Sequence, residues 1–268
     1  MWVAAVQLNS TPDMEANLSR ARTLISEAAR REAQLVALPE HFASYGPEET
    51  VAAAVQPLDG PLVTEFRQLA RKLGISLLLG SFPEQAGPGE LPYNTSVLVG
   101  PQGQILARYR KMHLFDLELP GARPHRESRF TQPGSEVVTA PLPGTPFVAG
   151  LAVCYDLRFP ELFRVQVSRG ANLLLLPAAF TYRTGRDHWQ ALLKARAIEN
   201  LSYVVAPAQW GQHGPGRRSY GRSLILDPWG LTLAQAPDGE GIIYAWLDFE
   251  RLYRLRRELP CLEHRCLK

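Results

Sequence analysis

The stretch FVAGLAVCYDLRFPELFRVQVSRGANLLLL, residues 147–176, contains the unit on which the fold is built. Its first seven residues, Phe147 to Val153, are almost wholly apolar and predict a buried strand. Because proline favours the first position of a helix, we expect a helix from about Pro160 to Arg169. A second apolar strand follows over Asn172 to Leu176. A strand, a helix and a second strand in this order are typical of α/β proteins.

The first half of the chain predicts the same order of elements. We expect strands at residues 2–8, 35–38 and 75–79, helices at 11–32 and 61–74, and a hairpin of strands at 95–99 and 104–109. Each helix has one apolar stripe, and each of the early strands is apolar throughout. Such strands are covered on both faces, so the helices are expected on the outside of a sheet.

After residue 176 the pattern continues with one helix and then a run of strands. The helix is predicted to begin near Asp187, where Gln190 completes the spacing of a capping box. Strands are expected at residues 203–207, 223–226, 231–235 and 241–247. Two mixed sheets packed face to face, with helices on both outer faces, account for this order. The sequence therefore predicts a four-layer αββα sandwich.

Length and composition limit the class of protein. The chain has 268 residues, 46% of them hydrophobic and 21% charged, and no low-complexity linker divides it. We predict one domain over residues 1–268, with a core at about 2–250 and a tail at about 251–268. The 29 basic and 26 acidic residues give a net charge of +3 and are scattered, so no nucleic-acid or membrane-surface partner is expected.

Cysteine usage and the N-terminal sequence predict a cytoplasmic protein. The segment MWVAAVQLNS lacks the positive region of a secretory signal, and the apolar stretches are shorter than the roughly 20 residues that span a bilayer. Three cysteines, Cys154, Cys261 and Cys266, are too few for a disulfide framework. Their spacing does not make a zinc site, so we expect no metal and no cofactor.

Three apolar strands each deliver an ionisable residue at or just beyond the C-terminal end. These residues are Glu40, Lys111 and Cys154. Ligands bind at the C-terminal ends of strands in α/β sheets, so the three side chains are candidates for one site. Taken singly, each has an ordinary structural explanation: a buried cysteine, a charge at a strand end and a loop carboxylate.

Together the three residue types predict nucleophilic chemistry. A thiol with a pKa near 8.5 is mostly protonated at neutral pH and needs a base or a cation to become a nucleophile. Glu40 can be the base and Lys111 the cation. Lys111 and the backbone N–H of Tyr155 can stabilise the negative charge that develops on an attacked amide or nitrile. Glu127 in the segment RESRF is a candidate to orient the lysine.

The segments around these residues are LPEHF at 38–42, YRKMHLFD at 109–116 and AVCYDLRFPELF at 152–163. In this order the chain resembles the nitrilase superfamily of carbon-nitrogen hydrolases, from Ala4 to about Arg257. The resemblance implies Cys154 as nucleophile, Glu40 as general base, and Lys111 as proton donor and oxyanion stabiliser. It also supports Glu127 as a second glutamate, and it implies the αββα fold and a homodimer.

Within that superfamily three further segments resemble the Nit branch, whose members hydrolyse deaminated glutathione to 2-oxoglutarate and Cys-Gly. They are PAAFTYRTGRDHW at 177–189, KARAIEN at 194–200 and SYGRSLILDPWG at 219–230. The related ω-amidases, which act on α-ketoglutaramate, are the nearest alternative. Arg222 stands where histidine is expected, and the stretch 211–221 is shorter than expected of an ω-amidase, which favours the first substrate.

The implied substrate is a small amide that carries two carboxylates, so arginine forks and hydroxyls are expected around it. The arginine candidates are Arg158, Arg183, Arg186, Arg218 and Arg222, of which Arg222 is the first choice. Thr181 and Tyr182 can supply hydroxyls, and Phe180 a wall of the pocket.

Three alternatives stay open at this stage. One is a nitrile or N-carbamoyl substrate for the same three residues. Another is a catalytically silent binding protein of the same fold, against which intact Glu40, Lys111 and Cys154 argue. The third is His188 as a base for Cys154, although no local signature of a papain-like protease surrounds the cysteine.

Overall fold

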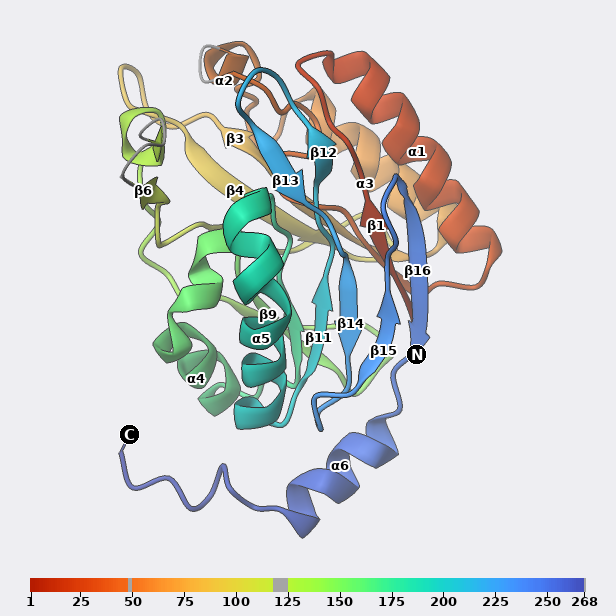
Figure 1. The fold of residues 1–268 in the computed structure, drawn as a ribbon. Helices are drawn as coiled ribbons and strands as arrows, with labels where there is room; N and C mark the ends of the chain where they lie inside the picture. The colour runs from red at the N-terminus through yellow and green to blue at the C-terminus, as the bar shows by residue number, and fades with distance from the viewer. Residues whose placement is uncertain (48–49, 118–124, 268) are drawn as a thin grey trace.

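Two six-stranded mixed sheets pack face to face in the computed structural model, which describes residues 1–47, 50–117 and 125–267 (Figure 1). The first sheet has the strand order β16-β1-β2-β3-β4-β5 and comprises β1 (Trp2–Gln7), β2 (Leu35–Ala37), β3 (Ser76–Glu84), β4 (Tyr93–Val99), β5 (Ile105–Arg110) and β16 (Gly241–Trp246). The second has the order β15-β14-β11-β10-β9-β8 and comprises β8 (Thr139–Pro141), β9 (Val148–Leu151), β10 (Leu173–Leu175), β11 (Tyr203–Ala206), β14 (Leu224–Leu226) and β15 (Thr232–Gln235).

Each sheet contains three neighbouring parallel strands flanked by antiparallel ones. β1, β2 and β3 are parallel in the first sheet, and β9, β10 and β11 are parallel in the second. The antiparallel strands β4, β5 and β16 complete the first sheet, while β8, β14 and β15 complete the second. The two halves of the chain therefore repeat one topology, as the order of elements predicts.

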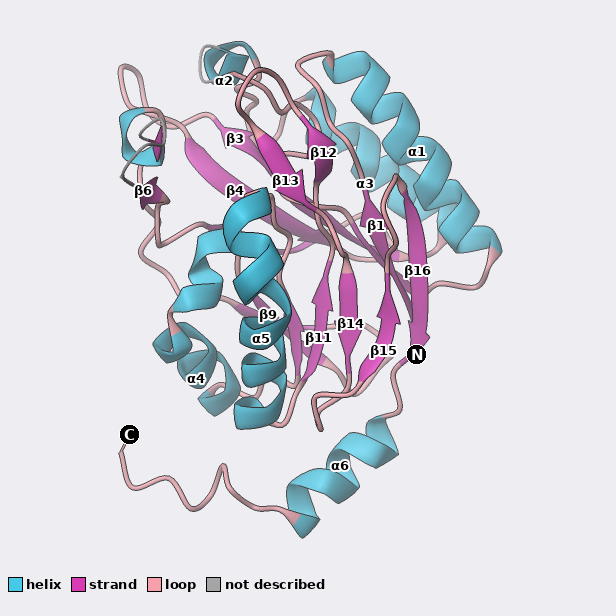
Figure 2. Cartoon of the chain, in the orientation of Figure 1, coloured by secondary structure: helices cyan, strands magenta, loops and turns pink. Residues whose placement is uncertain are grey.

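Helices cover the two outer faces of the sheets (Figure 2). The helices of the described chain are α1 (Met14–Arg30), α2 (Thr50–Ala53), α3 (Pro61–Leu73), α4 (Pro160–Ser168), α5 (Tyr182–Asn200) and α6 (Phe249–Glu258). α1 and α3 pack on the first sheet, and α4 and α5 on the second. The predicted four-layer αββα sandwich is confirmed. None of the described helices is long and apolar enough to cross a membrane.

Alternate residues of the same strand fill two different parts of the core. Val3 and Ala5 of β1 face the space between the sheets, whereas Ala4 and Val6 face the helices α1 and α3. All four side chains are fully buried. Because successive strand residues point to opposite faces, burial on both faces explains why this strand is apolar from Val3 to Val6.

The structure corrects the expected start of one helix. α5 begins at Tyr182, with Thr181 at its N-cap, and not near Asp187. Gly185 suggests a loop in the sequence, but it lies inside α5. The side chain of Tyr220 packs closely against the helix at this residue. A Cβ atom at residue 185 would lie 2.4 Å from the Cβ of Tyr220. Glycine is therefore required there by packing and not by a turn.

Two short hairpins near the ends of the sheets were not predicted. One joins β12 (Trp210–Gln212) to β13 (Arg218–Tyr220), and the other joins β6 (Asp116–Leu117) to β7 (His125–Arg126). Both lie in segments that are polar or rich in glycine, where strand periodicity is weak. The first hairpin packs against α5 beside the segment that carries Thr181.

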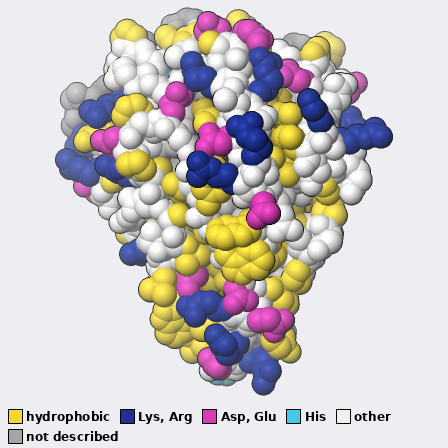
Figure 3. All heavy atoms as spheres, turned by 90° about the vertical axis from the view of Figure 1, so that its right-hand side faces the viewer, with side chains coloured by type: hydrophobic (Ala, Val, Ile, Leu, Met, Phe, Trp, Pro, Cys, Tyr) yellow, Lys and Arg dark blue, Asp and Glu magenta, His cyan; other side chains and the backbone are white. Residues whose placement is uncertain are grey.

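The edge formed by β1, β15 and β16 exposes several large apolar side chains, and hydrophobic atoms gather on this face (Figure 3). Trp2 and Trp246 are cross-strand partners whose rings lie 5.8 Å apart in an edge-to-face arrangement. Their exposed fractions are 40% and 54%. A separate shallow groove lies between Trp229 and α6.

Candidate active site

The three predicted catalytic side chains meet between the two sheets. Glu40 follows β2 and Lys111 follows β5, both in the first sheet, whereas Cys154 follows β9 in the second sheet and opens a short 3₁₀ helix, Cys154–Arg158. The chain around Glu40 is packed closely by the neighbouring strand, since a Cβ at Gly80 would lie 2.1 Å from the carbonyl oxygens of Leu38 and Pro39. The C-terminal ends of strands thus supply the site, as expected.

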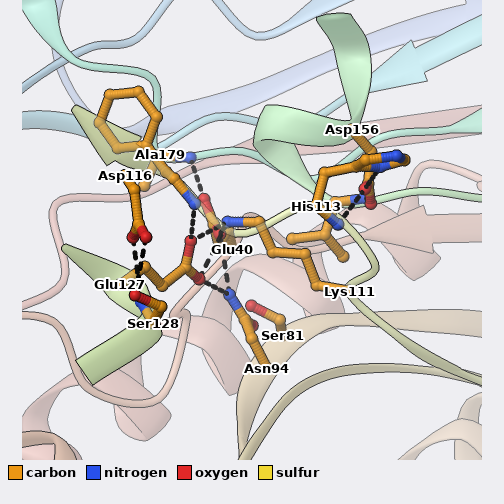
Figure 4. Close-up of polar contacts among 12 residues, drawn as sticks. Glu40, Ser81, Asn94, Lys111, His113, Asp116, Glu127, Ser128, Asp156 and Ala179 are labelled. Carbon is orange, nitrogen blue, oxygen red and sulfur yellow. Dashed lines mark hydrogen bonds and ion pairs between the residues drawn. The ribbon is translucent and has the colours of Figure 1, made fainter. Parts of the chain in front are cut away.

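Lys111 lies between two carboxylates (Figure 4). Its Nζ is 3.2 Å from Oε1 of Glu40, and 3.0 and 2.8 Å from the two oxygens of Glu127. The lysine side chain is 2% exposed, so these ion pairs are shielded from water. Asn94 of β4 donates to both carboxylates, at 3.0 Å to Glu40 and 3.2 Å to Glu127.

Each carboxylate is also held by a backbone N–H. The N–H of Ala179 donates to Oε2 of Glu40 at 2.7 Å, and that of Phe115 donates to Oε2 of Glu127 at 2.7 Å. Glu127 itself starts a short 3₁₀ helix, Glu127–Arg129. The two glutamates are therefore fixed by the folded backbone, and they in turn fix the ammonium of Lys111.

Cys154 has a strained backbone conformation. Its φ angle is 49°, in the left-handed region that residues with a Cβ rarely adopt. The N–H of Cys154 donates to the carbonyl of Pro177 at 2.9 Å, and the thiol interacts electrostatically with the Glu40 carboxylate. The N–H of Tyr155 has no acceptor within the described residues, so this donor is available at the nucleophile turn.

The charges of the three groups follow from burial and from their neighbours. Burial would raise the pKa of Glu40, but the Lys111 ammonium, His41 and hydrogen bonding to the carboxylate together outweigh burial and hold that pKa below its usual value. Burial would lower the pKa of Lys111, but Glu127 and Glu40 hold it well above the usual range. Burial and the Glu40 carboxylate both raise the pKa of the Cys154 thiol. At neutral pH the site contains a carboxylate, an ammonium and a protonated thiol.

A small pocket opens at the thiol. Its lining residues are Phe115, Cys154, Tyr155, Arg158, Ala179, Phe180, Thr181 and Thr184. Tyr155, Phe180 and Thr181 are therefore placed beside Cys154, as the sequence suggests. Arg158 is the arginine that lines this pocket, and its guanidinium lies 5.3 Å from the centre of the Phe180 ring.

Five of the expected substrate contacts lie outside the pocket lining: Arg183, Arg186, Arg218, Arg222 and Tyr182. Arg222 pairs with Asp238 at 2.9 Å, and its carbonyl accepts the indole N–H of Trp189 at 2.8 Å. Its φ angle of 60° shows that this residue holds a left-handed turn. Tyr182 is 40% exposed, and the guanidinium of Arg218 lies 4.0 Å from the centre of its ring.

Sequence reasoning missed four residues of the site. Asn94 has no distinctive spacing, although a buried polar side chain in the strand segment YNTSVLV is a signal. Phe115 lies within YRKMHLFD, beside Lys111, and Ala179 directly precedes Phe180, but neither was singled out. Thr184 lies one helical turn after Thr181, and their hydroxyls are 2.8 Å apart, but the helix that places it there was expected to start later.

His188 does not take the place of a catalytic base. Its Nδ1 lies 3.4 Å from the guanidinium of Arg158, on the exposed side of α5. The carboxylate that interacts with the thiol is that of Glu40. Over the described ranges, no three histidine, cysteine or acidic side chains are grouped so that they could hold a metal ion.

The site and the fold define a hydrolase built around a thiol, and the family comparison agrees. Residues 2–257 match the carbon-nitrogen hydrolase family, so the chain belongs to that family and hydrolyses carbon–nitrogen bonds in amides. It is 45% identical to the deaminated glutathione amidase of Bos taurus, over 98% of this chain and 81% of that protein.

Two solved structures extend the comparison. Nit3 of Saccharomyces cerevisiae, a member of branch 10 of the nitrilase superfamily, is 34% identical with a TM-score of 0.87, over 97% of this chain and 94% of that one. The amidase of Nesterenkonia sp. AN1 is 28% identical with a TM-score of 0.77, over 97% and 98%. A glutamate-to-glutamine variant of that amidase shows acrylamide added to its active-site cysteine. The expected membership of the superfamily is confirmed.

Proposed function

We propose that this protein hydrolyses the amide bond of deaminated glutathione, giving 2-oxoglutarate and Cys-Gly. The observation that carries the proposal is the pairing of Lys111 with Glu40 and Glu127 beside the Cys154 thiol, in a chain 45% identical to a deaminated glutathione amidase. The thiol, carboxylate and ammonium are the groups that acyl transfer from an amide requires.

Glu40 acts as the base of the first step. It accepts the proton of Cys154 as the sulfur forms a bond to the amide carbon, and the carbonyl oxygen becomes an oxyanion. The ammonium of Lys111 and the N–H of Tyr155 stabilise that charge. Because two carboxylates raise the pKa of Lys111, we assign delivery of the proton to the leaving amine nitrogen to protonated Glu40.

The first step ends when the acyl group is bound to Cys154, and the second step releases it. Collapse of the oxyanion breaks the carbon–nitrogen bond, releases the amine of Cys-Gly and leaves a thioester on Cys154. Glu40 then takes a proton from a water molecule, whose oxygen attacks the thioester carbon. The sulfur leaves, regains the proton from Glu40, and the carboxylic acid product is free.

Arg158 is the candidate for the carboxylate of the oxoglutaryl group. It lines the pocket at the thiol, whereas Arg222 is paired with Asp238 away from that lining. Thr181 and Thr184 line the same pocket and can donate to the 2-oxo group or the carboxylate. A guanidinium fork matches the geometry of a carboxylate.

Arg218 is the candidate for the second carboxylate, on the glycine end of the leaving group. Its guanidinium stacks on Tyr182, which follows the pocket residue Thr181, and Ser219 next to it bridges to Thr181. The Cys-Gly leaving group has two residues and spans at most about 7 Å when extended, so its glycine carboxylate stays near the pocket rim. Arg158 and Arg218 thus serve the two ends of one substrate.

The test compares kcat/KM for deaminated glutathione, α-ketoglutaramate and a simple aliphatic nitrile. We expect Arg158→Gln to lower turnover of both amides, because they share the oxoglutaryl group. Arg218→Gln should lower turnover of deaminated glutathione alone, by about 10- to 150-fold, the equivalent of about 1.5–3 kcal/mol. Arg186→Gln is the matched control, since Arg186 is paired with Asp187 on the surface.

Each alternative has its own outcome. Equal or better turnover of α-ketoglutaramate by the wild type would assign an ω-amidase, and turnover of the nitrile alone a nitrilase. No turnover of any carbon–nitrogen substrate would support a silent binding protein. A homodimer and a cytoplasmic location also belong to this proposal, and light scattering of the purified protein tests the first.

A further inference from the structure

Asp156 is a buried carboxylate that the mechanism above does not use. It lies two residues after Cys154 and is 0% exposed. Its Oδ2 accepts from the N–H of Val153 at 2.8 Å and from the hydroxyl of Tyr109 at 2.7 Å. Its Oδ1 accepts from the N–H of His113 at 3.1 Å and lies 2.7 Å from Nδ1 of the same residue.

These contacts join the two segments that carry the lysine and the nucleophile, and Figure 4 shows the one between Asp156 and His113. Tyr109 and His113 flank Lys111 by two residues on either side, and Val153 directly precedes Cys154. We propose that Asp156 is a positioning residue that fastens the lysine segment to the nucleophile turn and so sets the ammonium of Lys111 against the thiol.

A second contact strengthens the same connection. The ring of His113 stacks on the ring of Phe159, with centres 3.7 Å apart and planes 8° from parallel. Phe159 ends the 3₁₀ helix that Cys154 begins. The lysine segment is therefore attached to the middle of that helix through Asp156 and to the residue after it through Phe159. The strained backbone of Cys154 lies within the turn that the bond from the N–H of Val153 to Asp156 closes.

The chemistry of the site requires a carboxylate and not an amide at residue 156. An ionised carboxylate only accepts hydrogen bonds, so His113 must carry its proton on Nδ1. Both oxygens face a backbone N–H, one from Val153 and one from His113, and a backbone N–H can only donate. An asparagine has one acceptor oxygen, so in either orientation its NH₂ would face one of these two donors.

Asp156→Asn is therefore the decisive variant, and Asp227→Asn is its control. Asp227 is a buried carboxylate that accepts from the N–H groups of Trp229 and Leu231 and pairs with Arg251 at 2.6 Å, in the turn between β14 and β15. Both variants should lower the melting temperature. Only Asp156→Asn should lower kcat per folded molecule, by about 10- to 100-fold, the effect of a displacement of about 1 Å in the reacting groups.

Alkylation of Cys154 by iodoacetamide supplies a readout that lost stability alone would not change. If the lysine segment moves away, the thiolate loses its neighbouring cation, so the midpoint of the rate against pH should shift upward in Asp156→Asn. The same midpoint should stay at the wild-type value in Asp227→Asn. KM should change much less than kcat, because Asp156 does not line the pocket.

A kcat and an alkylation profile equal to those of the wild type, with only a lower melting temperature, would overturn the proposal. If Asp156→Asn does not fold, Tyr109→Phe tests the same idea. It removes the 2.7 Å bond to Asp156 and the longer 3.4 Å bond from the N–H of Met112, and it leaves the N–H groups of Val153 and His113 paired with Asp156. We expect a severalfold loss of kcat there. An unchanged kcat in that variant would count equally against Asp156 as a positioning residue.

Discussion

Replacing Glu127 by glutamine tests whether the second carboxylate is part of the catalytic unit. The change removes one negative charge from the pair of carboxylates around Lys111, and the lysine keeps only Glu40 as a counter-ion. The groups that face Glu127 are all donors: Lys111 Nζ, the amide of Asn94 and the N–H of Phe115. The NH₂ of a glutamine would therefore face a donor in either orientation.

The expected loss follows from these contacts. A hydrogen bond to a charged group contributes about 1.5–3 kcal/mol, and Lys111 loses at least one such bond to Glu127. If that bond holds the ammonium against the developing oxyanion, kcat should fall by about 10- to 150-fold. The structure thus predicts a larger effect than a merely supporting glutamate would give, because both oxygens of Glu127 contact Nζ.

The assay measures kcat and KM on an amide substrate together with the free energy of unfolding in urea. Asp227→Asn is the control for loss of a buried carboxylate far along the chain, and it should leave kcat unchanged. A Glu127→Gln enzyme with wild-type kcat and an equal loss of stability would refute the reasoning and reduce Glu127 to a structural ion pair.

Three further predictions concern the nucleophile, the pH dependence and the pocket rim. Cys154→Ala should abolish turnover without unfolding the protein, and mass spectrometry after iodoacetamide should find wild-type Cys154 labelled in parallel with lost activity. Burial lowers the pKa of His213 to about 4 from an ordinary value near 6.5. The unfolded chain therefore binds a proton at this residue more readily than the folded protein does, and the stability linked to neutral His213 is fully present above pH 6.5. That stability, at most about 3 kcal/mol, should be lost as the pH falls toward 4, and denaturation of His213→Gln should show a smaller loss over this window. Gly185→Ala should lower the melting temperature and raise KM, because its Cβ would meet Tyr220 of the adjoining hairpin, whereas Gly144→Ala, where nothing lies within 4 Å, should affect stability only through its backbone.

The layers of the fold could be predicted because burial on both faces makes β2, β9 and β10 wholly apolar and β1 apolar as far as Val6, and proline marks the starts of α3 and α4. The start of α5 could not, because Gly185 serves a contact with Tyr220, a residue far along the chain. The sequence around Gly185 contains no signal for a contact with a residue so far along the chain.

The positions of Glu40, Lys111 and Cys154 could be predicted because each follows the end of a strand, and strand ends meet in space. Their grouping could be predicted from the combined chemistry of a thiol, a carboxylate and an ammonium, and the resemblance supports it. The choice of Arg222 shows the limit of this reasoning. An unexpected residue type suggested a substrate contact, but the side chain pairs with Asp238 and the backbone forms a left-handed turn.

The origin of the catalytic groups in two different sheets has a consequence for fragments of the chain. Glu40 and Lys111 come from the first sheet and Cys154 from the second, and Glu40 is held by the N–H of Ala179 from the second half. Neither half of the repeat contains a nucleophile together with its base. Separated halves would be inactive, and on mixing, turnover would grow with the concentrations of both until they associate fully. Duplication of either half would therefore reproduce the sheet and its helices but not a complete set of catalytic side chains.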